Sequence, residues 1–158
     1  MKKYIFILVA CLIVGSASAQ INKGSVLVGA SSNLNFSSIS PDSGDNYSLF
    51  DLSLKGGYFF MDNLTAGLNL GYQNIDDFSI STLGLFGRYY YKGKFFGGVG
   101  FNVITYEDQD SQTSIPFEVG YAAFITDNIA VEPSLNLGIF EDYTSFGFRV
   151  GFSLYRNR

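Results

Sequence analysis

Six charged residues occur inside otherwise uncharged segments of the chain, and their side chains could form ion pairs with one another. Three are acidic and three are basic: Asp51, Lys55, Arg88, Glu118, Glu132 and Arg149. Each lies in a segment where apolar residues alternate with small or polar ones, and each falls on the polar side of that alternation. An unpaired buried charge costs several kcal/mol, so converging polar faces would require these six side chains to compensate one another.

Residue types that commonly carry enzymatic chemistry are scarce. The chain has no histidine, and its single cysteine is Cys11. A histidine base and a cysteine nucleophile are therefore excluded from the part of the chain beyond Cys11. No pair of carboxylates has a spacing that singles it out. The glycines of residues 97–100 lack the Lys-Ser/Thr that follows a phosphate-binding loop. We expect no catalytic residue, no cofactor and no metal site.

The N-terminus has the pattern of a secretory signal. Lys2 and Lys3 precede an apolar run over residues 4–14, and Ala17-Ser18-Ala19 follows as a cleavage site. The sequence predicts a cleaved signal peptide over residues 1–19 and one domain over residues 20–158. A lipoprotein signal ending at Cys11 is the alternative, but too few apolar residues precede that cysteine.

The composition is unusual for a soluble domain. Charged residues make up 15% of the chain, where about 25% is usual, and there are 18 Gly, 16 Phe and 11 Tyr. Without Lys2 and Lys3, the ten Lys and Arg fall to eight against fourteen Asp and Glu, a net charge of −6. A net negative chain without clustered cations is not expected to bind nucleic acid.

Eight segments alternate with a period of two, which is the period of a β-strand. In the clearest one, Leu64, Ala66, Leu68, Leu70 and Tyr72 share one face. The eight segments are residues 25–36, 50–60, 64–73, 78–91, 95–103, 115–125, 129–139 and 145–154. Most match the roughly 9–11 residues that a tilted strand needs to cross a bilayer. We therefore predict an eight-stranded antiparallel up-and-down transmembrane β-barrel, whose interior is closed by the six charged side chains.

The segments that connect these strands alternate between short and long. Short turns are expected at residues 61–63, 92–93 and 126–128, and longer loops near residues 38–46, 74–77, 107–112 and 140–143. The loops contain no Lys or Arg but nine acids: Asp42, Asp45, Asp76, Asp77, Glu107, Asp108, Asp110, Glu141 and Asp142. We expect an acidic rim at one end of the barrel. It could attract divalent cations or a cationic partner, but no complete calcium-loop spacing is present, and simple solvation of the loops is favoured.

Two stretches carry a resemblance to a known family. Residues 57–67, GYFFMDNLTAG, and residues 123–131, AFITDNIAV, each read as a strand, a tight Asp-Asn turn and a second strand. With the eight segments, they make the chain similar to the small outer-membrane β-barrels of the OmpA and OmpX type. The resemblance implies residence in the outer membrane of a Gram-negative-type bacterium, contact with lipid and lipopolysaccharide, and insertion by the barrel-assembly machinery.

Two functions from different classes fit the pattern. The first is a non-enzymatic integral outer-membrane barrel with a structural, adhesive or porin-like small-solute role and a largely closed polar lumen. The alternative is a soluble periplasmic, lipocalin-like barrel that binds an apolar ligand. Such a barrel needs an apolar interior and a charged exterior, which is the opposite arrangement of faces.

Overall fold

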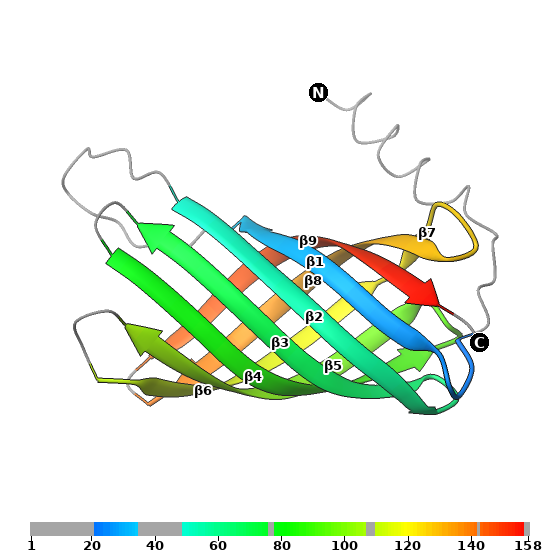
Figure 1. The fold of residues 1–158 in the computed structure, drawn as a ribbon, viewed down its shortest axis with the longest axis horizontal. Helices are drawn as coiled ribbons and strands as arrows, with labels where there is room; N and C mark the ends of the chain where they lie inside the picture. The colour runs from blue at the N-terminus through cyan, green and yellow to red at the C-terminus, as the bar shows by residue number, and fades with distance from the viewer. Residues whose placement is uncertain (1–20, 35–48, 76–77, 107–109, 142, 157–158) are drawn as a thin grey trace.

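A computed structural model describes residues 21–34, 49–75, 78–106, 110–141 and 143–156. The expected signal peptide, residues 1–19, lies outside these ranges. No helix in the described ranges is long and apolar enough to cross a membrane. The strands are β1 Val26–Leu34, β2 Leu49–Met61, β3 Leu64–Ile75, β4 Phe78–Tyr91, β5 Phe95–Tyr106, β6 Gln112–Tyr121, β7 Ala123–Phe124, β8 Ile129–Phe140 and β9 Thr144–Arg156. They run obliquely to the long axis of the molecule (Figure 1).

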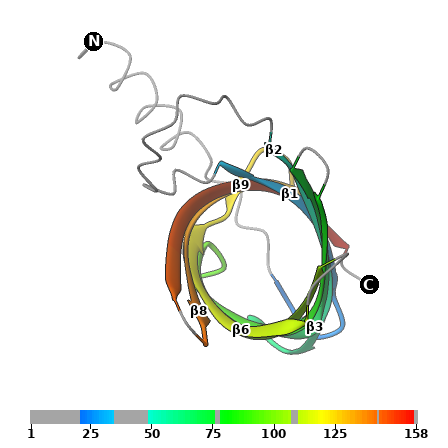
Figure 2. The ribbon, with the colours of Figure 1, turned by 90° about the vertical axis from the view of Figure 1, so that its left-hand side faces the viewer.

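All strands belong to one antiparallel sheet that closes on itself (Figure 2). Each strand pairs with the next strand in the chain, except that β6 and β7 do not pair with each other. The ring closes where β1 pairs with β9, with Val28 opposite Leu154. Both β6 and β7 pair with β8, in one continuous register. They are two parts of one barrel strand, so the ring has eight strands, as the sequence predicts. The break falls at Ala122, within the segment 115–125 that we expected to be uninterrupted. The Ala122 amide donates instead to the Lys94 carbonyl at 2.7 Å.

The short turns lie at one end of the barrel, on the right in Figure 1. Asn63, Lys92 and Gly93 have positive φ angles of 63°, 53° and 66°. Asn and Gly tolerate this left-handed conformation, which tight hairpin turns require. At the third turn, the Thr126 hydroxyl accepts a hydrogen bond from the Ile129 amide at 3.0 Å. Asn63, Gly93 and Thr126 therefore have the residue types that tight turns favour, whereas Lys92 adopts a positive φ angle without being one of them.

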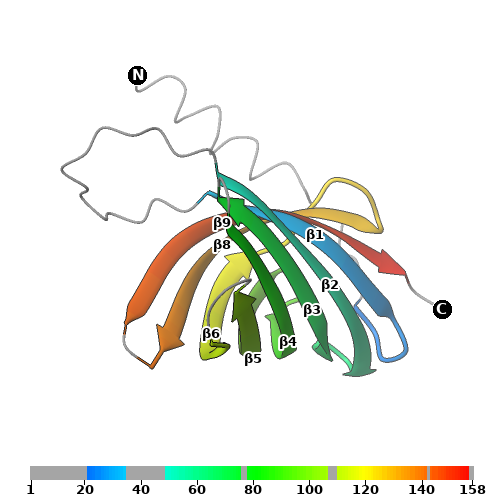
Figure 3. The ribbon, with the colours of Figure 1, turned by 60° about the vertical axis from the view of Figure 1, so that its left-hand side comes forward.

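Because side chains alternate along each strand, every strand has one face toward the outside of the barrel and one toward the interior. On β3, Leu68 and Leu70 are each 54% exposed, whereas Thr65 is fully buried. Figure 3 shows the curved, tilted strands of the barrel wall. The same outward apolar face continues around the ring through exposed residues such as Val28, Leu54, Leu85, Val99, Val119, Leu135 and Phe152. The expected eight-stranded barrel with apolar residues outside is confirmed.

The interior differs from expectation at the turn end. We expected small polar residues and ions throughout, but seven buried side chains fill this end with apolar and aromatic groups. We call them the turn-end plug: Ile21, Leu27, Phe59, Tyr90, Phe96, Phe124 and Tyr155. The six that lie in strands, all but Ile21, follow the same alternation as the inward polar residues. The direction of these six side chains was therefore expected, and their apolar character was not. The interior of an eight-stranded barrel is just wide enough for side chains to fill, so large rings can pack closely there.

Candidate functional site

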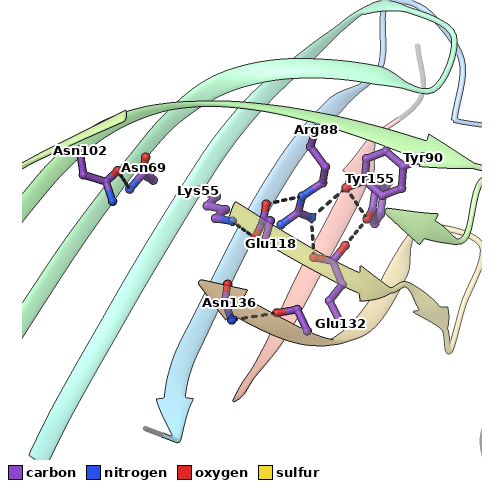
Figure 4. Close-up of polar contacts among 10 residues, drawn as sticks. Lys55, Asn69, Arg88, Tyr90, Asn102, Glu118, Glu132, Asn136 and Tyr155 are labelled. Carbon is purple, nitrogen blue, oxygen red and sulfur yellow. Dashed lines mark hydrogen bonds and ion pairs between the residues drawn. The ribbon is translucent and has the colours of Figure 1, made fainter. Parts of the chain in front are cut away.

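Four charged side chains from four strands meet inside the barrel, and we call them the ion cluster: Lys55, Arg88, Glu118 and Glu132. Glu118 accepts a hydrogen bond from Arg88 Nε at 2.9 Å and another from Lys55 Nζ at 2.7 Å. Arg88 Nη1 reaches Glu132 at 2.8 Å. The side chains of Arg88, Glu118 and Glu132 are buried, and that of Lys55 is 13% exposed. Figure 4 shows them converging from opposite walls, so the cluster crosses the lumen.

Glycine at one position of β5 gives Arg88 room to reach Glu118. Arg88 pairs in register with Gly98, and Gly98 pairs with Glu118. A Cβ on Gly98 would lie 2.9 Å from Glu118 Oε1 and 3.0 Å from the carbonyl oxygen of Gly87. Side chains on one face of neighbouring strands crowd one another, so the missing side chain leaves the gap that the ion pair occupies.

Two tyrosines connect the ion cluster to the turn-end plug. Arg88 Nη1 lies 2.9 Å from the Tyr90 hydroxyl, and the hydroxyls of Tyr90 and Tyr155 are 3.1 Å apart. The Tyr155 hydroxyl also donates to Glu132. The Arg88 guanidinium lies 4.0 Å from the ring centre of Phe96, a cation–π distance. These contacts give the buried charges partners on the plug side as well as across the lumen.

The rings of the plug contact one another in tilted and edge-on arrangements. Tyr90 is 5.6 Å from Phe59 and 5.6 Å from Phe96, and Tyr155 is 5.1 Å from Phe124, measured between ring centres. These separations are typical of favourable aromatic pairs. Phe59 and Tyr90 have no exposed surface and Tyr155 is 1% exposed. Packed rings therefore fill the turn end of the lumen.

A cavity of about 280 Å³ with mixed polar and apolar walls lies on the other side of the ion cluster, toward the long loops. We call it the chamber. Lys55, Glu118 and Arg149 lie at its inner end, and its walls include Asn69, Asn102 and Asn136. Asn69 donates to Asn102 at 3.1 Å. A second cavity of about 20 Å³ lies between the ion cluster and β1 and β9; about 10–15 Å³ suffices for one water molecule.

Aromatic residues line the chamber near the loops. The rings of Phe140 and Tyr143 stack with centres 4.2 Å apart, and the Tyr106 hydroxyl donates to Gln112 at 3.1 Å. Partial burial and the neighbouring Tyr106 hydroxyl raise the pKa of Tyr143 above its ordinary value. Tyr143 therefore keeps its proton at neutral pH and can act as a hydrogen-bond donor.

The structure brings together only some of the six residues that we expected in the lumen. It brings Lys55, Arg88, Glu118 and Glu132 into contact, and Arg149 borders both cavities. Asp51 lies on β2 opposite Gln73, and nothing is described of its side chain. Of the nine expected rim acids, Asp110 and Glu141 are described and exposed. The other seven, and with them most of the proposed rim, lie outside the described residues: Asp42, Asp45, Asp76, Asp77, Glu107, Asp108 and Asp142.

Sequence reasoning missed Tyr90 and Tyr155 as partners of the ion cluster. A signal for them was present in the alternation. Tyr90 is two residues beyond Arg88, and Tyr155 is two residues beyond the inward Ser153. A strand places residues two apart on the same face, so both rings had to point inward.

A closed ring of eight antiparallel strands, apolar outside and ion-paired inside, is the fold of the small outer-membrane β-barrels. The crystal structure of the outer membrane protein OprG from Pseudomonas aeruginosa matches with a TM-score of 0.58 and 12% identity, over 89% of this chain and 99% of that one. The N-terminal β-barrel domain of OprF from the same organism matches with a TM-score of 0.60 and 16% identity, over 85% and 98%.

A third similar structure is the outer membrane protein Ail of Yersinia pestis in a phospholipid bilayer nanodisc, with a TM-score of 0.55 and 11% identity, over 85% of this chain and 99% of that one. No protein-family model and no curated protein matches the chain. At these identities the comparisons confirm, for the fold, the resemblance carried by residues 57–67 and 123–131.

Proposed function

We propose that this chain is a non-enzymatic integral protein of the bacterial outer membrane, with a structural role in the envelope and a lumen that is closed to ions. The observation that carries the proposal is the outward face: large apolar side chains such as Leu68, Leu85 and Phe152 are more than half exposed around the ring. In water, so large an apolar surface would drive association, whereas lipid chains match it. Lipid and lipopolysaccharide are the proposed surroundings, reached through the barrel-assembly machinery.

Two barriers in series support a closed lumen. The ion cluster joins β2, β4, β6 and β8 across the interior, and the turn-end plug leaves no exposed surface at Phe59 or Tyr90. An eight-stranded barrel has an interior that side chains can just fill. This arrangement supports a structural role more than passage of solutes through the whole barrel.

The lipocalin-like alternative would require an apolar ligand cavity and a charged exterior. Here the larger cavity has amides, hydroxyls and charged groups beside its apolar lining residues, and the exterior of the strands is apolar. Both features oppose that alternative.

Membrane fractionation combined with heat-modifiability tests the proposed location and fold together. The full chain, expressed in a Gram-negative host, should sediment with the outer membrane. It should also migrate differently on detergent gels before and after boiling, because a closed barrel resists detergent until heated. Recovery of the folded chain in the soluble periplasmic fraction would contradict the proposal and favour the lipocalin-like alternative.

A further inference from the structure

The chamber is a blind pocket whose walls offer hydrogen-bonding groups. The ion cluster lies at its inner end and the turn-end plug lies beyond, so its open side faces the long loops. Its volume of about 280 Å³ is near the lower end of the roughly 300–1,000 Å³ of small-molecule sites. We propose that the chamber binds a single neutral, hydroxylated ring of the monosaccharide class. This inference goes beyond the proposed envelope role and assumes only that the barrel folds as described.

The charges at the inner end favour a neutral ligand because they already compensate one another. Within the ion cluster, Lys55 and Arg88 balance Glu118 and Glu132. Arg149, which also borders the chamber, has an interaction partner of its own. A charged ligand would therefore enter a lumen in which the described charges are engaged, and a buried charge without a partner is strongly unfavourable.

The two ends of the chamber carry different charges, and together they oppose ligands of either sign. Asp110 and Glu141 are exposed at the loop end, where they would repel an anion. Lys55 and Arg149 lie at the inner end, where a cation would approach two positive side chains. A neutral molecule meets neither electrostatic barrier.

Three asparagine amides supply hydrogen bonds from facing walls. Asn69 Nδ2 donates to Asn102 Oδ1 at 3.1 Å, across Gly84, which stands between them in register. That contact uses one of the four N–H donors of the pair. Asn136 lies on β8, which faces β3 across the ring, and it donates to Ser134 with one of its two N–H groups. Figure 4 shows Asn136 apart from the other two amides, so a ring with several hydroxyls can be held from two sides.

Aromatic rings supply a surface for the C–H face of a sugar. Phe140 and Tyr143 stack with ring centres 4.2 Å apart, and both line the chamber together with Tyr106. Tyr143 is 48% exposed, so part of its side chain is open to contact. Small-molecule sites combine aromatic walls with a few well-placed polar groups in this way. The hydroxyls of a sugar ring match the amides, and its C–H face matches the aromatic rings.

Solution NMR of the isotope-labelled barrel in dodecylphosphocholine micelles tests this inference, because NMR detects weak binding and assigns it to a place. Glucose, galactose and mannose are the probes, and this detergent has no sugar headgroup. We expect at least one of the probes to shift the side-chain amide signals of Asn69, Asn102 and Asn136 in a saturable way. The signal of the exposed Asn22 should stay unchanged. No saturable shift with any of the probes in a folded barrel would overturn the inference.

Matched ligands test the chemistry of recognition. Glucuronate adds a negative charge to the sugar ring, choline carries a positive charge, and cyclohexanol keeps a ring with a single hydroxyl. The best neutral sugar should bind at least about fivefold more tightly than each of them, the factor that corresponds to one ordinary hydrogen bond of about 1 kcal/mol. Equal or tighter binding of glucuronate or choline would contradict the selection of a neutral ligand. Equal binding of cyclohexanol would contradict recognition of the hydroxyls.

Two sets of variants connect the binding to the chamber, measured at the Asn136 signal. The double variant Asn69→Leu with Asn102→Leu removes both partners of a hydrogen bond, a change that can be nearly neutral for stability, and should weaken sugar binding at least about fivefold. Asn22→Leu, at an exposed position of the turn end, should leave binding unchanged. Tyr143→Leu should weaken binding, whereas Tyr143→Phe keeps the ring and should retain most of it. Undiminished binding by the double variant or by Tyr143→Leu contradicts the inference.

Two controls keep the results interpretable. Heat-modified migration of each variant before titration separates a loss of fold from a loss of binding, and it also separates failure of this inference from failure of the proposed membrane role. A disaccharide that ends in the bound sugar, tested beside the monosaccharide, distinguishes the source of the ligand. Binding of the monosaccharide alone supports a free sugar, and binding of the disaccharide as well supports the end of a neutral glycan.

Discussion

Arg88 and Glu118 lie on strands that are not neighbours, and their side chains meet at 2.9 Å across β5. Thirty residues separate them in the chain. The contact depends on Gly98, which stands between them in register and carries no side chain. From Glu118 the bonds continue to Lys55, and from Arg88 to Glu132, so one pair organises the whole ion cluster.

The first prediction concerns the charge on Glu118. Glu118→Gln leaves Lys55 and Arg88 without their shared carboxylate in a buried site, and removal of one partner from a buried ion pair costs about 3–5 kcal/mol. Urea unfolding of the barrel in lipid vesicles should show this loss of unfolding free energy. Glu141→Gln, at an exposed position, is the control and should change stability by no more than about 0.5 kcal/mol. Equal effects of the two changes would mean that Glu118 does not hold buried charge.

A second prediction tests the gap at Gly98. Gly98→Ala places a Cβ 2.9 Å from Glu118 Oε1 and should destabilise the barrel by about 1–3 kcal/mol, the usual cost of overpacking. The matched control is Gly87→Ala on β4, where an added Cβ meets nothing within 4 Å. Denaturant midpoints of the two variants measure the difference. Identical midpoints would show that Glu118 moves aside without cost.

A third prediction tests the lipid-facing surface. Leu68 points outward and is 54% exposed. Leu68→Arg should reduce the free energy of folding into a bilayer by about 2–4 kcal/mol if the residue lies near the midplane, because lipid cannot solvate the guanidinium. Leu68→Ala is the size control and should cost less. Folding titrations into lipid vesicles measure both changes, and an arginine variant as stable as the alanine variant would count against a membrane location for this face.

The fourth prediction separates the stability of the barrel from the closure of its lumen. Phe59→Ala removes a fully buried ring of the turn-end plug and should cost about 3–5 kcal/mol. Planar-bilayer recordings should nevertheless show no large steady conductance for either the variant or the parent barrel. The reason is that Arg88 still joins Glu118 and Glu132 across the lumen. A large steady current through the parent barrel would refute the closed lumen.

Much of the fold could be predicted from the order of residues. A strand has a side-chain period of two, so the alternation Leu64, Ala66, Leu68, Leu70 on one face and Thr65, Gly67, Asn69 on the other fixes which side is apolar. Asn63 and Gly93 mark tight turns by the backbone conformations that they tolerate. These are local properties, readable from a few consecutive residues, and they gave the eight strands and their outward faces.

The contacts inside the barrel could not be obtained in the same way. That Lys55 and Arg88 share Glu118, while Tyr155 reaches Glu132, depends on the stagger between strands and on ring closure. Closure brings together residues as far apart as Lys55 and Glu118, which are 63 positions apart in the chain. Alternation can assign a residue to the inner face. Alternation does not show which inward residues meet at the same height in the barrel, or whether aromatic rings or ions fill that height. Both depend on how the strands are tilted and joined.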